Sequence, residues 1–109
     1  NKFIKIQDQS LKYAKNIYWV FGVLIKPNKK FDRDLIVKKL LKKNIQTRNF
    51  FYPMHKQNIF KRLKIFKRKI KLPNSEFLSR NGFYLPSGLG ITNKEIIYTC
   101  KVLNTILKK

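Results

Sequence analysis

Short apolar runs alternate with polar stretches along the chain, and their spacing predicts a succession of strands and helices. The β-branched and aromatic run 17–25 predicts a strand covered on both faces. Before it, residues 2–15 mix apolar and charged side chains, which leaves open the end of a helix or a connecting segment. After it, Asp32 is a good N-cap for an amphipathic helix over 33–43, and Asn44 suits a left-handed stop.

The middle of the chain is first β-prone and then strongly basic. Residues 45–51 predict a strand, which Pro53 must end. The stretch 59–70 carries apolar residues at the spacing of a helix face, and these are Ile59, Leu63, Phe66 and Ile70. It overlaps the most basic part of the chain, with seven Lys or Arg among residues 61–71.

Glycine, proline and capping residues divide the C-terminal third of the chain. Asn74 predicts the cap of a short helix that runs through Arg80, with Gly82 as its stop. Residues 83–85 predict a short strand, and residues 86–90 predict a loop.

The last helix begins at a capping box, in which Thr92 is followed three residues later by Glu95. It runs to about residue 107, and its apolar face consists of Ile96, Cys100, Leu103 and Leu107. Cys100 is therefore expected to be a buried thiol. Taken together, the elements predict an α+β fold, a small antiparallel sheet with helices packed on one face.

The charge balance raises the question of a polyanionic partner, because 26 Lys and Arg against 5 Asp and Glu give a net charge of +21. The favoured explanation is compositional drift toward Lys, since the basic residues are scattered along the whole chain. The alternative is a stand-alone basic module that binds nucleic acid or an anionic membrane surface through residues 60–71. No transmembrane segment is expected, because the longest apolar run is about half of the roughly 20 residues that a membrane-spanning helix needs.

Few residues can carry chemistry. One His and one Cys cannot form a closed zinc site, so no metal is expected. His55 is either structural or, because histidine titrates near neutrality, functional. Arg48, on an otherwise apolar strand, predicts either a salt bridge or a clamp on a carboxylate or phosphate. Gly88 and Gly90 predict either a turn that needs glycine torsion angles or a loop that lies close to a ligand.

Five blocks of the sequence resemble the sugar aminotransferase family of the DegT/StrS type, and its perosamine-synthase-like members in particular. The blocks occur in the order of that family, with similar gaps between them. The resemblance covers about residues 17–107, and the blocks are 18–21, 32–35, 45–57, 73–76 and 82–92.

This resemblance implies that residues 17–109 are the small C-terminal domain of a fold-type-I aminotransferase, and that residues 1–16 are the end of a connecting segment or helix. The large domain, which carries the Schiff-base lysine and most contacts to pyridoxal phosphate (PLP), is expected to lie outside this chain. The chain alone is then expected to hold no catalytic residue and to be inactive. The family implies a cytoplasmic homodimer that moves an amino group, typically from glutamate, to a nucleotide-linked keto sugar.

The same resemblance implies that Arg48, Tyr52 and His55 face the substrate or cofactor. Arg48 suits a contact to a diphosphate or to the carboxylate of the amino donor. Tyr52 is expected to shape the same wall of the site. At Lys64 the family commonly has a glycine, which puts the local turn of this chain in doubt.

Overall fold

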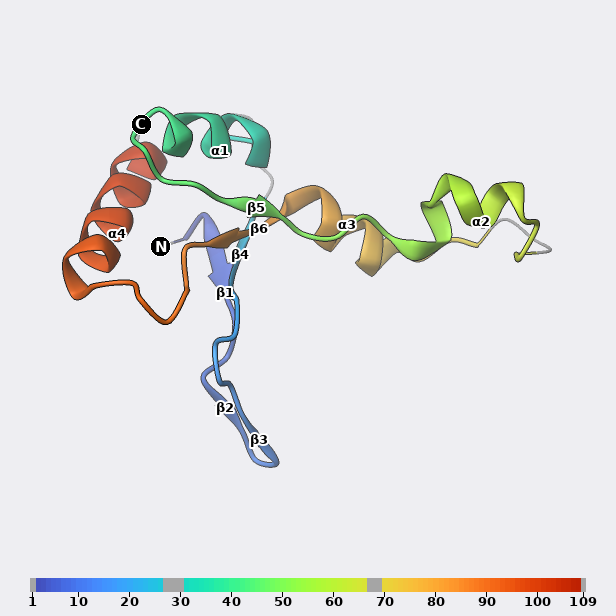
Figure 1. Ribbon diagram of the computed structural model, residues 1–109, viewed down its shortest axis with the longest axis horizontal. Helices are drawn as coiled ribbons and strands as arrows, with labels where there is room; N and C mark the ends of the chain where they lie inside the picture. The colour runs from blue at the N-terminus through green and yellow to red at the C-terminus, as the bar shows by residue number, and fades with distance from the viewer. Residues whose placement is uncertain (1, 27–30, 67–69, 109) are drawn as a thin grey trace.

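A computed structural model describes residues 2–26, 31–66 and 70–108. Its centre is a four-stranded antiparallel sheet in the order β1-β4-β6-β5. Figure 1 shows the sheet beside two helices, α1 and α4, with a hairpin and a helical arm projecting away from it. The strands of the sheet are β1 (Ile4–Ile6), β4 (Phe21–Ile25), β5 (Arg48–Asn49) and β6 (Gly82–Leu85).

The N-terminal segment is a strand and a hairpin, so its alternative assignment as the end of a helix is wrong. Strand β1 pairs with β4, with Ile4 opposite Ile25. The hairpin follows, formed by β2 (Ser10–Leu11) and β3 (Ala14–Lys15). In β1 apolar and charged residues alternate over only three positions, and that is too short a run to reveal a strand in the sequence.

Strand β4 begins at Phe21, four residues later than the apolar run predicts. Tyr18 has a left-handed backbone (φ 49°), and its N–H donates to the Asn16 side chain at 2.8 Å. This local turn competes with strand pairing, so Ile17 and Trp19 stay exposed, at 87% and 78%. Within β4 itself the backbone is paired on both edges.

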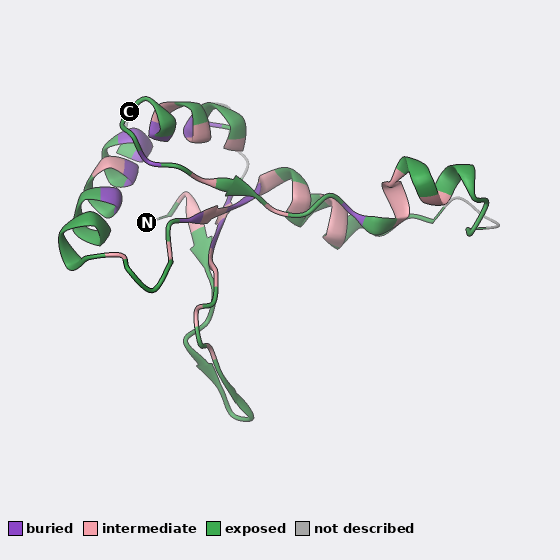
Figure 2. Ribbon diagram, viewed as in Figure 1, coloured by how far each residue is buried: buried purple, intermediate pink, exposed green. Residues whose placement is uncertain are grey.

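Helices α1 (Arg33–Leu41) and α4 (Asn93–Lys108) cover one face of the sheet. Figure 2 shows the buried residues gathered between these helices and the two central strands. Burying a large apolar side chain contributes roughly 1.5–3 kcal/mol, so this layer holds the fold together. The predicted α+β architecture, with helices on one face, is confirmed, and its core consists of Val23, Ile25, Phe31, Ile36, Leu40, Ile45, Phe83, Leu85, Leu103, Ile106 and Leu107.

Local capping signals set the helix boundaries as expected. The carboxylate of Asp32 accepts from the N–H of Leu35 at 2.7 Å, and Asn44 after α1 has φ 58°. At the start of α4, the N–H of Thr92 donates to the Glu95 carboxylate at 2.8 Å, and the N–H of Glu95 donates back to Thr92 Oγ1 at 3.3 Å. This reciprocal pair is the predicted capping box.

The buried face of α4 differs from the predicted one. It consists of Thr99, Leu103, Ile106 and Leu107, whereas Ile96 is 43% exposed and Cys100 is exposed. The expectation of a buried thiol is therefore wrong. The buried residues of α4 begin only at Thr99, in the second half of the helix's first eight residues, so its first turn lies outside the core.

The second face of the sheet is covered by Phe50, whose ring lies against Gly22 and Gly82 and stacks on Tyr84 at 4.6 Å between centroids. Gly82 ends α3 as predicted, and its extended backbone (φ −99°, ψ 146°) also begins β6. Glycine stands there because the Phe50 ring occupies the space of a side chain.

Helix α3 (Pro73–Asn81) begins at Pro73 and not after Asn74, because proline suits the first position of a helix. Its N-cap is Leu72, which provides no side-chain hydrogen bond. Helix α3 leads directly into β6 and connects the sheet to the arm.

The arm consists of the 3₁₀ turn η1 (Met54–Lys56), helix α2 (Asn58–Arg62) and the residues that follow to 66. The prediction of one continuous helix through residue 70 is wrong, because Lys64 has φ 52° and the helix ends before it. Residues 67–69 of that stretch lie outside the described part of the chain. The radius of gyration is 16.2 Å, against roughly 13 Å for a compact domain of this length, because the arm and the hairpin project.

Replacing Lys64 by glycine should stabilise α2. A left-handed backbone costs a non-glycine residue about 1 kcal/mol or more, so we expect roughly fivefold greater hydrogen-exchange protection of the amides of Leu63 and Ile65, which donate to Ile59 and Phe60. Lys61→Gly, inside the helix, should lower that protection by a similar factor. If Lys64→Gly lowered the protection as Lys61→Gly does, the left-handed backbone at Lys64 would be contradicted.

Candidate functional site

The predicted residue Arg48 lines a hollow of about 690 Å³ at the β5 edge of the sheet. Strand β5 pairs with β6, with Arg48 opposite Tyr84, and this pairing fixes the backbone that carries the guanidinium. Among the described residues no carboxylate lies within ion-pair distance of Arg48. Its donors are therefore available to a ligand, and the other lining residues are Val20, Val37, Leu41, Gln46, Thr47, Tyr84, Leu85, Pro86, Ser87 and Gly88.

The second predicted residue, Tyr52, lines a different hollow of about 480 Å³, here called the basic hollow. It lies where the chain leaves β5 and meets the start of α1 and the end of α3. Tyr52 is 58% exposed, so its ring is a wall of this hollow and not part of the core. The lining residues are Arg33, Asn49, Phe50, Tyr52, Pro53, Lys56, Glu76, Ser79 and Arg80.

The third predicted residue, His55, lines none of the hollows described here. Its side chain is 4% exposed, and Nε2 donates to Oε1 of Glu76 at 3.1 Å. The other oxygen of Glu76 accepts from the amine of Lys56 at 2.6 Å. The imidazole thus joins η1 to α3, and the structure does not bring His55, Arg48 and Tyr52 together around one hollow.

These contacts change the acidity of Glu76. The hydrogen bond from Lys56, followed by that from His55, lowers the pKa of Glu76 to about 2. Glu76 is therefore ionised across the physiological pH range and holds the Lys56 amine and the His55 imidazole in place.

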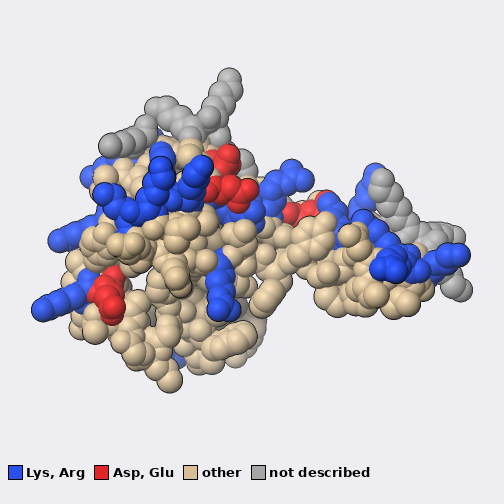
Figure 3. Space-filling view, turned by 45° about the horizontal axis from the view of Figure 1, so that its top comes forward, with Lys and Arg blue, Asp and Glu red and all other residues tan. Residues whose placement is uncertain are grey.

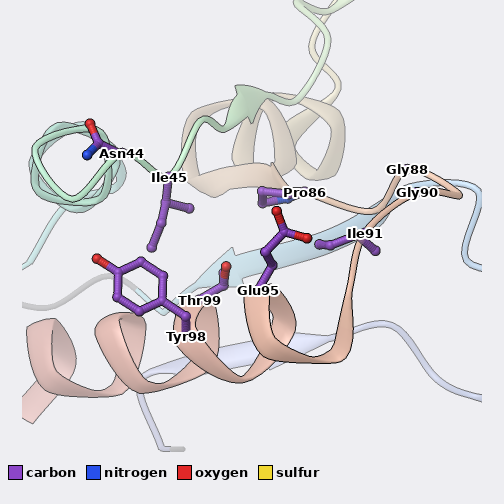
Figure 4. A pocket seen from close by; sticks show the side chains of 9 residues that line it. All are labelled: Asn44, Ile45, Pro86, Gly88, Gly90, Ile91, Glu95, Tyr98 and Thr99. Carbon is purple, nitrogen blue, oxygen red and sulfur yellow. The ribbon is translucent and has the colours of Figure 1, made fainter.

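A third hollow, of about 440 Å³, lies between α4 and the loop 86–90 (Figure 4). Hydrogen bonds from the backbone and side chain of Thr92 occupy the carboxylate of Glu95 and lower its pKa. The hydroxyl of Tyr98 donates to the carbonyl of Lys43 at 3.2 Å. Oε2 of Glu95 and the hydroxyl of Tyr98 thus already have partners outside the lining of this hollow.

The two glycines of the loop 86–90 do not adopt the backbone torsion angles that only glycine favours. Neither Gly88 nor Gly90 has a positive φ, so the prediction that they supply glycine torsion angles is wrong. A Cβ at either position would meet no atom within 4 Å. The other prediction, a loop that lies close to a ligand, stays open.

Sequence reasoning missed Arg33, Glu76 and Arg80, which share the basic hollow. On the amphipathic helix that the sequence predicts, Arg33 is a polar position, yet its Nη1 donates to the carbonyl of Ser79 at 2.6 Å and its Nη2 lies 2.8 Å from Asp34. Arg33 and Ser79 are 46 residues apart, so no spacing in the sequence could reveal this contact.

Comparison with known proteins identifies the family. The sequence profile of the DegT/DnrJ/EryC1/StrS aminotransferases matches residues 2–104, nearly the whole chain. The chain belongs to this family. The resemblance found in the sequence is thereby confirmed.

Individual relatives agree with this assignment. The chain is 28% identical to GDP-perosamine synthase of Escherichia coli O157:H7 over 104 residues, which are 95% of the chain and 26% of that enzyme. Its fold matches Helicobacter pylori PseC, an aminotransferase of pseudaminic acid biosynthesis, with a TM-score of 0.83 at 16% identity, covering 99% of this chain and 28% of PseC. The chain thus spans about a quarter of the length of these relatives.

A third relative carries the cofactor. The fold matches E. coli GDP-4-keto-6-deoxy-D-mannose-3-dehydratase with bound hydrated PLP at a TM-score of 0.64 and 22% identity, covering 93% of this chain and 25% of the enzyme. PLP is the cofactor of this family. The same fold therefore occurs in an aminotransferase and in a dehydratase.

The described residues of this chain do not fit the covalent attachment of PLP. The cofactor needs a lysine amine that is free to bond its aldehyde. Lys56 lines the basic hollow, where the Glu76 carboxylate holds its amine at 2.6 Å, and Lys15 lines a hollow of about 350 Å³ at the exposed hairpin.

Residues 2–26, 31–66 and 70–108 contain no cluster of three or more His, Cys, Asp or Glu that could hold a metal ion. No helix in these ranges is long and apolar enough to cross a membrane.

Proposed function

We propose that this chain is the C-terminal small domain of a PLP-dependent enzyme that transfers an amino group from glutamate to a nucleotide-linked keto sugar. The observation that carries the proposal is the similarity to GDP-perosamine synthase along 95% of the chain. The shared fold with PseC supports it. The complete enzyme is proposed to be a cytoplasmic homodimer, with the PLP lysine in a large domain and no catalytic residue in residues 17–109.

Within this proposal, each predicted residue has a different part. Arg48 lies beside a hollow and has no carboxylate partner within the described part of the chain, which suits a forked contact to the donor carboxylate or to the diphosphate of the substrate. Tyr52 forms a wall of the neighbouring hollow. His55 is buried against Glu76, so its role toward substrate is to position the segment that carries Tyr52.

The test is expression of the longest reading frame that contains this chain, supplied with PLP, glutamate and nucleotide-linked keto sugars. We expect an amino sugar as product, and no product from the 109-residue chain alone. Product analysis also separates amine transfer from the removal of a hydroxyl group, the reaction named for the dehydratase relative. A reading frame that turns over neither donor nor sugar would exclude the proposal.

The role of Arg48 can be measured in the same assay. A lost charge-assisted hydrogen bond costs about 1.5–3 kcal/mol, so Arg48→Gln should raise KM for the donor or the sugar roughly ten- to hundredfold. Arg62→Gln makes the same charge change on α2 and should leave KM unchanged. An unchanged KM in Arg48→Gln would remove Arg48 from the site.

A second candidate function is the basic module, motivated by the net charge of +21. In Figure 3 the Lys and Arg side chains are spread over the visible face and do not form one stripe, which favours drift. A salt titration against duplex DNA, single strands and anionic vesicles tests it. Binding that persists at moderate salt would support this candidate, and its absence would exclude it.

A further inference from the structure

The arm is a part of the molecule where exposed apolar side chains and exposed cations occur together. It projects away from the sheet, so that both kinds of side chain are open to a partner (Figure 1). Ile59, Leu63 and Ile65 are 51%, 61% and 53% exposed. In Figure 3 the arm is the lobe on the right, where Lys and Arg side chains border a surface of other residues. Its exposed cations in the described ranges are Lys61, Arg62 and Lys64.

Helix α2 separates the two kinds of side chain. Ile59 and Leu63 are four residues apart and therefore share one side of the helical turn, whereas Lys61, two positions from each, lies on the other side. A segment that is apolar on one side and basic on the other is typical of structures that lie in the plane of a membrane interface. Contact of this kind needs no membrane-spanning helix.

No acidic residue opposes the cations of the arm. Residues 35–75 contain no Asp or Glu. Within the described ranges, no carboxylate lies within ion-pair distance of Lys61, Arg62 or Lys64. Glu76, the first acidic residue after this stretch, is already bonded to η1. Each cation is therefore available to a negatively charged surface, and a basic residue close to anionic lipid strengthens binding about fivefold.

Two other partners fit the arm less well. A second copy of this chain would bring like charges together, because the net charge is +21. Single-stranded nucleic acid is commonly bound by aromatic rings on which its bases stack. The rings of Phe60 and Phe66 instead pack edge-to-face on each other, at 6.1 Å between centroids. The apolar side chains that the arm exposes most are aliphatic, which suits lipid.

We propose that the arm docks on an anionic membrane surface, with its exposed aliphatic side chains in the lipid interface and its three cations against the headgroups. The inference depends on the exposed residues of the arm and not on the proposed function. The second candidate function draws on the charge of the whole chain, whereas this surface is confined to residues 54–66.

The test is co-sedimentation of the full chain with phosphatidylcholine vesicles, with and without phosphatidylserine, at fixed ionic strength. We expect binding only where phosphatidylserine is present. Lys61→Gln combined with Lys64→Gln should weaken it roughly twentyfold. Lys38→Gln combined with Lys42→Gln makes the same charge change at exposed positions of α1 and its C-cap, and should bind within about twofold of the unchanged chain. No binding to either kind of vesicle would overturn the proposal.

The contact of the arm with lipid is tested by a substitution that keeps the charge. Ile65→Ser should weaken vesicle binding roughly tenfold, because an aliphatic side chain is lost from the interface. Ile17→Ser, the same change at an exposed position beyond β3, should have little effect. An unchanged affinity of Ile65→Ser would overturn the proposal, as would equal losses in the two charge pairs, since binding would then follow total charge. Circular dichroism checks that each variant is folded.

Two further measurements decide between lipid and the other partners. Tighter binding to DNA than to phosphatidylserine vesicles, lost in the variant with both Lys61 and Lys64 replaced, would overturn the proposal in favour of nucleic acid. Sedimentation velocity without vesicles should show the same oligomeric state for the unchanged chain and Ile65→Ser. A dimer that Ile65→Ser dissociates would assign the surface to a second copy.

Discussion

Replacing Gly82 by alanine is expected to lower the free energy of unfolding by about 1–3 kcal/mol, the usual cost of overpacking a filled site. A Cβ on residue 82 would stand 2.5 Å from Cγ of Phe50, far inside van der Waals contact. That carbon is the base of the ring, so a small rotation of Phe50 cannot clear it. The backbone of Gly82 is extended and accepts alanine freely, and the cost is therefore steric alone.

Alanine substitutions at two other glycines, measured by urea unfolding, serve as controls with smaller expected losses of stability. A Cβ at Gly22 would lie 3.1 Å from Phe50 Cζ, at the outer end of the ring, so Gly22→Ala should cost less. Gly88→Ala meets no atom and should be neutral or stabilising by a few tenths of a kcal/mol. In a Phe50→Ala background the cost at Gly82 should nearly vanish. If Gly82→Ala still lowered the free energy of unfolding in the Phe50→Ala background, the clash would involve a residue other than Phe50.

Replacing Glu76 by glutamine should remove the contact that holds η1 against α3. The amide keeps one acceptor for His55 but presents an N–H where Lys56 needs an oxygen. The imidazole, 4% exposed, then sits beside a cation that has lost its partner. We expect a clear loss of stability at neutral pH, measured by urea unfolding, together with greater hydrogen exchange in residues 54–57.

The effect should depend on pH with a definite sign. The folded-state pKa of Glu76, about 2, lies below its ordinary value of 4.5, so its stabilisation is complete above pH 4.5 and is lost as the pH falls toward 2. The difference between wild type and Glu76→Gln should therefore be large at pH 6 and close to zero near pH 2. Asp8→Asn, the same charge change at an exposed position, should show no such convergence. A difference that stays constant with pH would contradict the assigned contacts.

Both predictions concern the segment that carries the candidate site residues. Phe50 anchors the exit of β5 against the two glycines, and the contact between His55 and Glu76 anchors η1. Tyr52 lies between these anchors and borders the basic hollow. Loss of either anchor should therefore displace Tyr52 as well as lower stability.

The candidate site was only partly accessible from the sequence. The family resemblance directed attention to Arg48, Tyr52 and His55, and their roles stay predictions. The structure places Arg48 and Tyr52 at separate hollows and His55 against Glu76. Arg33 and Arg80 looked like ordinary helix-surface charges, because only the meeting of α1 with α3 gives them a common ligand space.

The sequence by itself determined the family, the α+β class and the helix boundaries at Asp32, Asn44 and Thr92. These boundaries depend on hydrogen bonds between residues three or four positions apart and on single backbone torsions, which local sequence controls. Only the tertiary structure decided the use of Gly82 and the partner of His55. Phe50 and Gly82, like His55 and Glu76, lie far apart along the chain, and they meet only because strand pairing and the packing of α3 bring their segments together.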